Sequence, residues 1–271
     1  MTSNESIRKV AALDTAVPVL MYHSITKDAS SLPVGQSLAY SVSISDFNAQ
    51  LSEIRASNIS VVPLPTLTDG VDTHGYSAVI TFDDGSESDY HTTLPALLDA
   101  RCKATFFLST ANIGSKGYVT WSQVREMQQA GMHFGTHAHD HIPLTPLSKE
   151  NAREQLYRSK AILEERIGTE VTSMSAPFGF INREVEFIAR ELGYKTICTS
   201  SAKMARWGAS LVPRVAVMQW TTIEEFRGLI TGDWRTYFSR RFKQTATYLP
   251  KQVLLHFRPI APGIRGLKRD A

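Results

Sequence analysis

Short apolar runs alternate along the chain with longer segments whose apolar residues recur every three or four positions. The short runs are typical of buried strands and the longer segments of amphipathic helices. Strands are predicted over residues 17–23, 61–64, 78–82, 104–108, 132–135, 172–179, 196–199 and 212–217, and the one over 172–179 is broken by Pro and Gly. Helices are predicted over residues 45–54, 93–98, 120–130, 148–167 and 185–192, and from residue 222 onward. This alternation indicates a parallel α/β fold.

Polar residues and glycines predict where several of these helices begin and end. Ser45 is expected to cap the first helix, and Ser148 to begin the long polar helix that Gly168 ends. Thr222 is followed three positions later by Glu225, a spacing that predicts a capping box. We therefore expect the last part of the chain to be helical.

The length of 271 residues allows one large α/β domain, and no internal repeat or low-complexity linker divides it. We expect a polar leader over residues 1–16, a main domain over 17–220 and a helical extension of that domain over 221–271. Apolar residues make up 42% and charged residues 20%, as in ordinary globular proteins.

The charge balance argues against a nucleic-acid partner, because 29 basic and 26 acidic residues leave a net charge of only +3. Basic residues do gather towards the end of the chain. They are Arg235, Arg240, Arg241, Lys243, Arg265, Lys268 and Arg269. They form either a solvated helix face or a weak contact with an anionic partner or membrane surface.

Features of the sequence that bear on location point to the cytoplasm. Residues 1–16 lack the apolar segment of a secretory signal, and no stretch approaches a membrane span. Cys102 and Cys198 lie in apolar segments, so we expect two small core residues in a reducing compartment rather than a disulfide.

The predicted strand over residues 78–82 runs directly into two carboxylates, Asp83 and Asp84, followed by Gly85. Neighbouring side chains on a strand point to opposite faces, so the two acids share a site only if the chain turns sharply, which Gly85 permits. Two carboxylates at a buried strand end need a positive charge beside them. A metal ion is the expected source.

A histidine cluster supplies the other predicted ligands. His137, His139 and His141 fall within five positions, and the rings of His137 and His141 would meet one ion if the segment formed a helical turn. His139 would then point away and lie at the surface. Two histidines with one carboxylate bind zinc and several other divalent metals, while the alternative is a group of surface histidines without metal.

These two segments carry a resemblance to a known family. Residues 81–85 and 137–141 resemble the first two motifs of the polysaccharide deacetylases, also called the NodB-homology domain or carbohydrate esterase family 4. Residues 19–23, Trp121 and residues 213–214 are also similar, and the likeness spans about residues 17–217. It implies a distorted, TIM-like (β/α)7 barrel with a short helical tail, and metal-dependent hydrolysis of an N-acetyl group on a sugar.

The resemblance also implies roles for individual residues. Asp84, His137 and His141 would bind one divalent ion, with zinc expected first and cobalt, manganese, iron or nickel as alternatives. Asp83 would be the general base, since an acid beside such an ion can accept a proton from water. The alternative for Asp83 is a turn or helix-capping acid.

The chain departs from the family pattern at the second and third motifs. Ala138 stands where Ser or Thr is usual, so one supporting hydrogen bond is missing. Residues 175–178 lack the arginine that usually precedes Pro177 by two positions, and Arg214 is the candidate replacement partner for Asp83, unless its role is structural.

The general acid and the substrate contacts are assigned from shorter patterns. His256, in Leu254-Leu255-His256, fits the fifth motif as the acid, although Asp233-Trp234 matches the preceding motif poorly. His23 competes for that role, with a structural or substrate-binding role as the preferred interpretation. The resemblance marks the following as substrate-binding candidates: His23, Trp121, Pro177 and Phe178.

The first functional hypothesis is an intracellular N-deacetylase acting on a glycan precursor, a glycolipid or a sugar metabolite. The leader without a signal argues against mature chitin or peptidoglycan as its substrate. One alternative is a carbohydrate-binding or assembly protein on the same fold that has lost turnover, and another is an amide or imide hydrolase with a non-sugar substrate. Substrate choice is expected to depend on loops such as residues 25–41.

Overall fold

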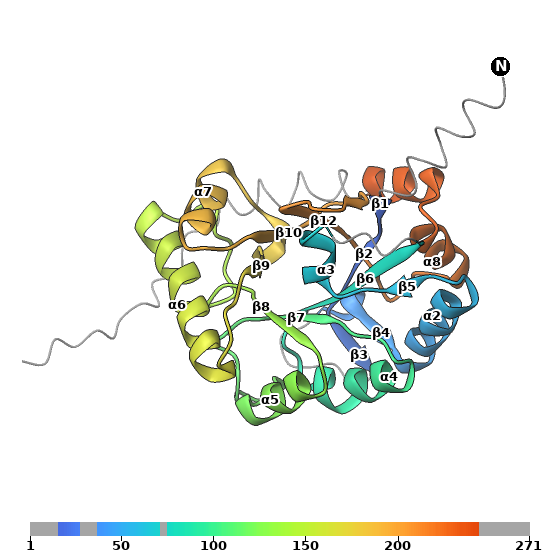
Figure 1. Ribbon diagram of the computed structural model, residues 1–271, viewed down its shortest axis with the longest axis horizontal. Helices are drawn as coiled ribbons and strands as arrows, with labels where there is room; N and C mark the ends of the chain where they lie inside the picture. Colours follow the sequence, from blue (N-terminus) through green and yellow to red (C-terminus); the bar gives the residue numbers. More distant parts are fainter. Residues whose placement is uncertain (1–15, 28–36, 71–74, 244–271) are drawn as a thin grey trace, which may run out of the picture.

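The computed structural model describes residues 16–27, 37–70 and 75–243, and within them parallel strands close into a barrel (Figure 1). The barrel strands are β2 (Val19–Tyr22), β6 (Ser77–Asp84), β7 (Thr105–Leu108), β8 (His133–Thr136), β9 (Ser173–Ser175), β10 (Thr196–Ser200) and β12 (Leu211–Ala216). They are bonded in the order β2-β12-β10-β9-β8-β7-β6, and pairing of β2 with β6 closes the ring. The predicted (β/α)7 barrel is confirmed.

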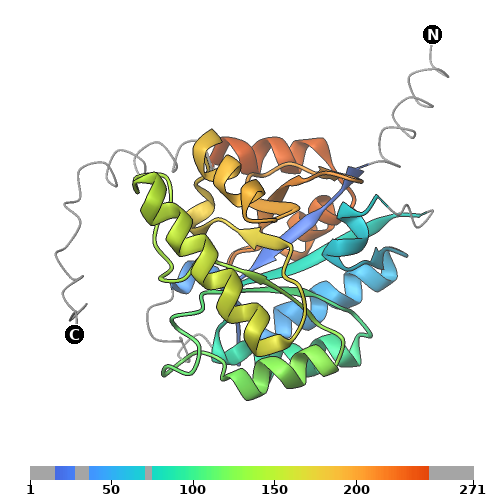
Figure 2. The ribbon, with the colours of Figure 1, turned by 60° about the vertical axis from the view of Figure 1, so that its left-hand side comes forward.

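Helices cover the outside of this barrel. They are α2 (Ile44–Ala56), α4 (Leu94–Asp99), α5 (Trp121–Gln129), α6 (Lys149–Ile167), α7 (Arg183–Glu191) and α8 (Ile223–Ile230), and a further helix spans residues 234–243. Figure 2 shows them from the side, with α6 crossing the front. Helices α2 to α8 each follow a strand, whereas the helix over residues 234–243 follows α8. Crossovers of this kind align the barrel strands and bring their carboxyl ends to one rim.

Short elements complete the chain around this frame. They are α3 (Leu64–Thr68), the 3-10 helices η1 (Leu38–Tyr40) and η3 (Pro177–Gly179), and the π-helix η2 (Asp89–Thr93). Strand β5 (Ser60–Val61) extends the sheet beyond β6. Strands β3 (Ser24–Thr26) and β4 (Ser41–Ser43) form one separate pair, and β1 (Ala16–Val17) and β11 (Ala205–Arg206) form another.

The core has two parts, because alternate strand residues point to opposite sides of the sheet. The larger part packs the barrel against the helices and includes stacked Phe82 and Phe106, whose ring centroids lie 4.9 Å apart. The smaller part fills the barrel with Val79, Phe107 and Cys198 among others. The barrel interior is therefore packed below the rim rather than open.

One glycine fixes how closely two barrel strands approach. A Cβ atom on Gly135 of β8 would lie 2.6 Å from the ring of Phe107 and 2.7 Å from the carbonyl oxygen of Ser173. Real Cβ atoms do not approach other atoms that closely, so β8 needs glycine here for Phe107 to fill the barrel.

Several local predictions were wrong at element ends. The cap of α2 is Ser43, whose Oγ accepts from the backbone N–H of Asp46 at 3.0 Å, rather than Ser45. The run predicted as a strand over 61–64 ends at Val61. Glu225 does not complete a capping box through its side chain, because its carboxylate pairs with Arg240 at 2.6 Å.

Other predictions are confirmed or lie outside the described residues. Cys198 is buried, Cys102 is half-buried and both are free thiols. The polar leader lies outside the described residues except for Ala16, and the division near residue 220 stays a prediction. Across residues 16–27, 37–70 and 75–243, we find no helix with the length and apolar character needed to cross a membrane.

Candidate metal centre and active site

Asp83 and Asp84 end β6 at the rim, where the chain turns sharply. The turn begins one residue earlier than predicted, because Asp84 has φ 81° and Gly85 has φ 80°, both in the left-handed region. Asp84 is therefore lifted out of the strand alternation. His137 Nε2 lies 3.9 Å from an Asp83 oxygen and 3.5 Å from Asp84 Oδ1, so both acids face one ring.

The histidine segment reaches the same place by a different backbone from the one predicted. Residues 137–141 form a bend, with Ala138 at φ 58° and His141 at φ 52°, so the predicted helical turn is wrong. The rings of His137 and His141 nevertheless lie 5.0 Å apart between centroids. His141 Nε2 is 3.1 Å from Asp84 Oδ1.

Asp84, His137 and His141 form a candidate metal site. One ligand atom from each lies within 4.8 Å of the others. The Oδ1 atom of Asp84 is buried and has no well-aligned hydrogen-bond donor among the described residues, although both histidine rings are near it. An unpaired buried carboxylate oxygen between two imidazoles fits a divalent cation.

The charge states of the three side chains suit this use. Burial lowers the pKa of His137 to about 4 against the opposing pull of Asp83, so this ring is neutral at physiological pH. Its Nδ1 lies 2.9 Å from the carbonyl oxygen of Ser175, which fixes Nδ1 as the donor and leaves the Nε2 lone pair facing the acids. Burial alone would raise the pKa of Asp84, but His141 and His23 hold it well below its usual value.

The prediction that His139 lies at the surface is wrong. It is buried, and its Nδ1 lies 2.8 Å from the hydroxyl of Thr110. It does point away from the metal cluster, as expected, and it ties the histidine segment to the loop after β7.

Asp83 is not one of the three candidate metal ligands, and it forms an ion pair with Arg214 instead. Its Oδ1 and Oδ2 accept from the two terminal guanidinium nitrogens at 2.7 Å each, and both side chains are buried. Burial raises the pKa of Asp83, but Arg214 and then His137 outweigh it and hold the pKa below its usual value. Asp83 is therefore ionised and fixed in orientation.

Arg214 contacts Asp83, as expected for the candidate replacement of the missing third-motif arginine. Ser175, two positions before Pro177, donates to Asp83 at 3.1 Å and accepts from Arg214 at 2.7 Å. The small serine leaves room for the guanidinium, which also lies 5.2 Å from the ring centroid of Phe107 inside the barrel. The structure thus brings Arg214 to the position that the sequence suggested.

The predicted substrate-binding residues divide into two groups. The ring of His23 packs on that of Tyr40, with the centroids 4.4 Å apart. Phe178, which directly follows Pro177, has an exposed side chain and a backbone φ of 60°, and its ring centroid lies 5.1 Å from that of His141. Trp121 begins α5, where the guanidinium of Arg166 lies 5.7 Å from its ring. This contact is with a residue of α6 and not with the candidate metal ligands. His256 lies outside the described residues.

Sequence reasoning missed one acid near the site. Asp89 in η2 is fully buried, and neither carboxylate oxygen has a hydrogen-bond partner in the described part of the chain. Burial first, and then the charges of Asp84 and Asp83, raise its pKa well above the usual value. Asp89 is thus a candidate for a neutral carboxylic acid, and no motif in the sequence marks it.

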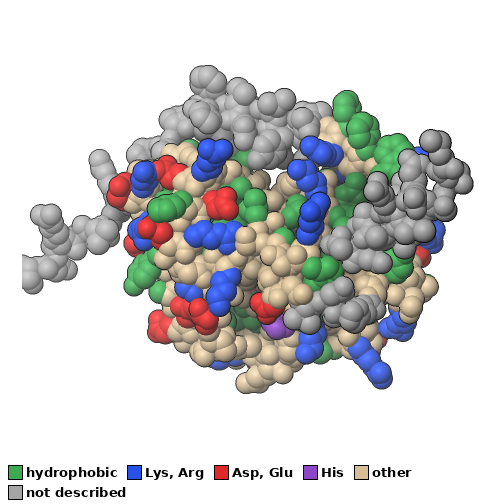
Figure 3. All heavy atoms as spheres, turned by 45° about the horizontal axis from the view of Figure 1, so that its top comes forward, with side chains coloured by type: hydrophobic (Ala, Val, Ile, Leu, Met, Phe, Trp, Pro, Cys, Tyr) green, Lys and Arg blue, Asp and Glu red, His purple; other side chains and the backbone are tan. Residues whose placement is uncertain are grey.

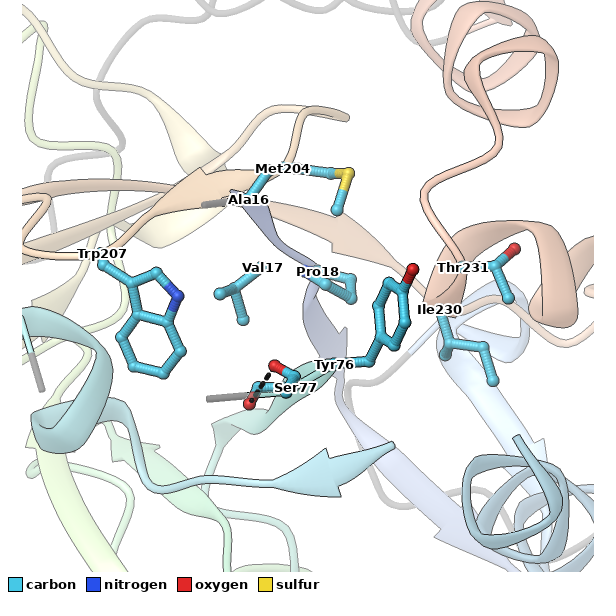
Figure 4. A pocket seen from close by; sticks show the side chains of 10 residues that line it. Ala16, Val17, Pro18, Tyr76, Ser77, Met204, Trp207, Ile230 and Thr231 are labelled. Atoms are coloured by element: carbon cyan, nitrogen blue, oxygen red, sulfur yellow. Dashed lines mark hydrogen bonds between the residues drawn. The ribbon is translucent and has the colours of Figure 1, made fainter. Parts of the chain in front are cut away.

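A pocket at the opposite end of the barrel has different chemistry. Figure 4 shows side chains converging there from β1, the start of β6 and the loop before β12, and its lining includes Val17, Tyr76, Ser77, Trp207 and Ile230. Ser77 begins β6 whereas Asp84 ends it, so this pocket is separate from the metal cluster.

Comparisons with known proteins agree with this site. A sequence family described as polysaccharide deacetylase matches residues 70–197, which include both acids and all three clustered histidines. Over this segment the chain is similar to the polysaccharide deacetylases. A Bacillus subtilis relative, YxkH, whose assignment as a polysaccharide deacetylase is provisional, is 29% identical over 66% of this chain and 62% of its own length.

Further relatives and solved structures show the same similarity. The peptidoglycan-N-acetylglucosamine deacetylase PgdA of Listeria monocytogenes is 32% identical over 44% of this chain and 24% of its own length. The chain thus spans less than two thirds of these curated relatives. The solved structure of IcaB from Ammonifex degensii is 26% identical, with a TM-score of 0.69 over 80% of this chain and 96% of that one. The Streptococcus pyogenes deacetylase PplD shares the fold at 24% identity, with a TM-score of 0.70 over 77% and 95% of the two chains.

Proposed function

We propose that this chain is a metal-dependent hydrolase that removes the N-acetyl group from an N-acetylated sugar. The observation that carries the proposal is an ionised, arginine-held Asp83 beside the separate donor set Asp84, His137 and His141. The deacetylase names of relatives such as PgdA support the substrate class. A glycan precursor, a glycolipid or a sugar metabolite is the expected substrate, and the cytoplasm stays the predicted compartment.

The residues divide the chemistry between them. One divalent ion, with zinc expected first, would be held by Asp84, His137 and His141. When bound, this ion lowers the pKa of water and polarises an amide carbonyl. Asp83 accepts the proton of the attacking water, because its lowered pKa keeps it ionised at neutral pH. Arg214 is a positioning residue that fixes both oxygens of this base.

His23 is our candidate for the group that protonates the leaving amine. It lies at the end of β2, close enough for its charge to lower the pKa of both Asp83 and Asp84. Its Nδ1 is buried with no hydrogen-bond partner among the described residues. This supports an acid role beside the substrate contact expected from the sequence, with His256 as the competing candidate.

A substrate panel tests the proposal. Protein loaded with zinc or cobalt is incubated with N-acetylglucosamine, its short oligomers, simple N-alkyl acetamides and cyclic imides, and acetate or ring opening is measured. We expect acetate from the N-acetylated sugars, its loss on chelation and its return with metal. His23→Gln should reduce the rate more than His256→Gln.

The panel also separates the alternatives. Turnover of imides without acetate release would favour the non-sugar hydrolase, and saturable binding of oligomers without turnover would favour the binding protein. The missing third-motif arginine and the uncertain general acid are the two reasons to expect lost turnover, and the contact of Arg214 with Asp83 weakens the first of them.

A further inference from the structure

The helix over residues 234–243 exposes large aromatic side chains and buries an arginine. A surface helix usually turns its apolar stripe towards the core and its charges outward. Here Arg240 is only 9% exposed, whereas Trp234, Phe238 and Phe242 are between 66 and 70% exposed. These three aromatic residues are spaced by four, so they form one outward stripe, which we call the aromatic face.

Specific polar contacts hold this orientation. Arg240 donates to the hydroxyl of Thr221 at 2.7 Å and pairs with Glu225 at 2.6 Å. Tyr237 donates to the carbonyl of Leu229 at 3.1 Å, and Asp233 caps the helix through Thr236. The inner face is therefore fixed, and the aromatic face is a built feature of the fold. The prediction of a solvated basic face is wrong for Arg240.

The part of the sequence that begins with this helix is rich in positive charge. The whole chain has 29 Lys and Arg against 26 Asp and Glu, and residues 234–271 hold nine of the basic residues but only one acid, Asp270. Residues 1–233 thus carry 20 basic against 25 acidic residues. Beside the aromatic face stand Arg235, Arg241 and Lys243. Figure 3 shows hydrophobic side chains gathered at the upper right of the molecule, with Lys and Arg side chains near them.

We propose that the aromatic face docks on an anionic membrane surface. Exposed aromatic residues on one side of a helix, flanked by Lys and Arg, enter the headgroup region while the charges meet anionic lipids. A nucleic acid would be met by the same charges, but the unbroken apolar stripe favours the lipid interface over phosphates alone.

The position of the helix relates this surface to the metal cluster. Thr221, which Arg240 contacts, lies in the loop after β12, and β12 ends at the same rim as Asp84. In that loop Trp220 is also exposed, at 57%. A membrane bound to the aromatic face would lie beside the rim, where substrates anchored in it could reach the site.

Vesicle flotation with the full chain tests the proposal without any measurement of activity. Vesicles of phosphatidylcholine alone are compared with vesicles containing 30% phosphatidylglycerol, at low and high salt. We expect binding to the anionic vesicles that weakens with salt, and a loss of about tenfold or more in Phe238→Ser/Phe242→Ser. The matched control is Tyr157→Ser/Phe187→Ser, which removes two aromatics of similar exposure from α6 and α7 and should bind as the parent does.

Several results would overturn this assignment. Equal flotation of both double variants, or no flotation of the parent, would reject the membrane surface. Binding to a single-stranded oligonucleotide that is lost in the Phe238/Phe242 variant would assign the face to nucleic acid, and a dimer lost in that variant would assign it to self-association. Asp84→Ala should float normally, since this proposal does not rest on the deacetylase function.

Discussion

Replacing Arg214 by methionine should destabilise the protein strongly, because it leaves the Asp83 carboxylate buried without its counter-charge. Both terminal nitrogens of Arg214 lie 2.7 Å from Asp83 oxygens, and the two side chains are 0% and 3% exposed. Removing one partner of such a buried pair costs about 3–5 kcal/mol of unfolding free energy. We expect that loss at pH 7 in urea unfolding followed by circular dichroism.

The double variant Arg214→Met/Asp83→Asn separates the pair from the packing around it. With the negative charge gone, methionine no longer leaves an uncompensated ion, so the double variant should lose less than the sum of the single variants by about 2–3 kcal/mol. Additive losses across this cycle would refute the pair as the source of the stability.

The stabilisation by the Arg214–Asp83 pair should also depend on pH. Arg214 holds the folded-state pKa of Asp83 below its unfolded value near 3.9, so this stabilisation is complete above about pH 4 and is lost as the pH falls further. In Arg214→Met burial raises the pKa of Asp83 without this opposing charge, so the gap in unfolding free energy between parent and variant should narrow as the pH falls from 7 to 3. A gap that stays constant from pH 7 to pH 3 would contradict the argument.

Three further predictions follow from buried groups at the site and in the core. Asp89→Asn should stabilise the protein at pH 7 in urea unfolding, by about 1.4 kcal/mol for each unit by which the Asp89 pKa is raised. The reason is that a raised pKa lowers the unfolding free energy progressively as the pH rises above about 3.9, where the unfolded chain releases the proton and the folded chain keeps it. A loss of stability would reject a neutral Asp89. Ion affinity, measured by calorimetry with zinc, should fall about tenfold per pH unit below the pKa of His141, which Asp84 raises against the effect of burial, whereas a flat profile would exclude competition with that proton. Gly135→Ala should cost about 1–3 kcal/mol through its clash with Phe107, while Gly75→Ala, with open space around it, should cost little; equal losses would reject the packing argument.

The barrel and the metal cluster could be predicted because local sequence patterns determine both. Strand runs and helix stripes fix the α/β alternation, and each of the first two motifs follows a strand, so closing the barrel brings Asp84, His137 and His141 together. The backbone of residues 137–141 could not be predicted, because Ala138 and His141 take left-handed conformations that only the surrounding contacts explain. Thr110, the partner of His139, is likewise far away in the sequence.

The partner of Asp83 lies between these two cases. The sequence placed Arg214 at a strand end from which Asp83 was within reach, but a structural role was equally consistent. The register of β12 against β10, which sets Arg214 beside Ser200, turns the guanidinium into the barrel under Asp83. That register depends on closure of the whole sheet, which no local pattern encodes.

The different roles of the two neighbouring aspartates are the central claim, and acetate release per bound ion tests them most directly. Parent, Asp83→Asn and Asp84→Ala are each loaded with zinc, their metal content is measured, and acetate release from an N-acetylglucosamine oligomer is followed. We predict that Asp83→Asn keeps about one ion per chain but loses activity by a factor of roughly 10² or more, and that Asp84→Ala loses the ion itself. Full activity in ion-loaded Asp83→Asn, or undiminished metal in Asp84→Ala, would contradict the assignment.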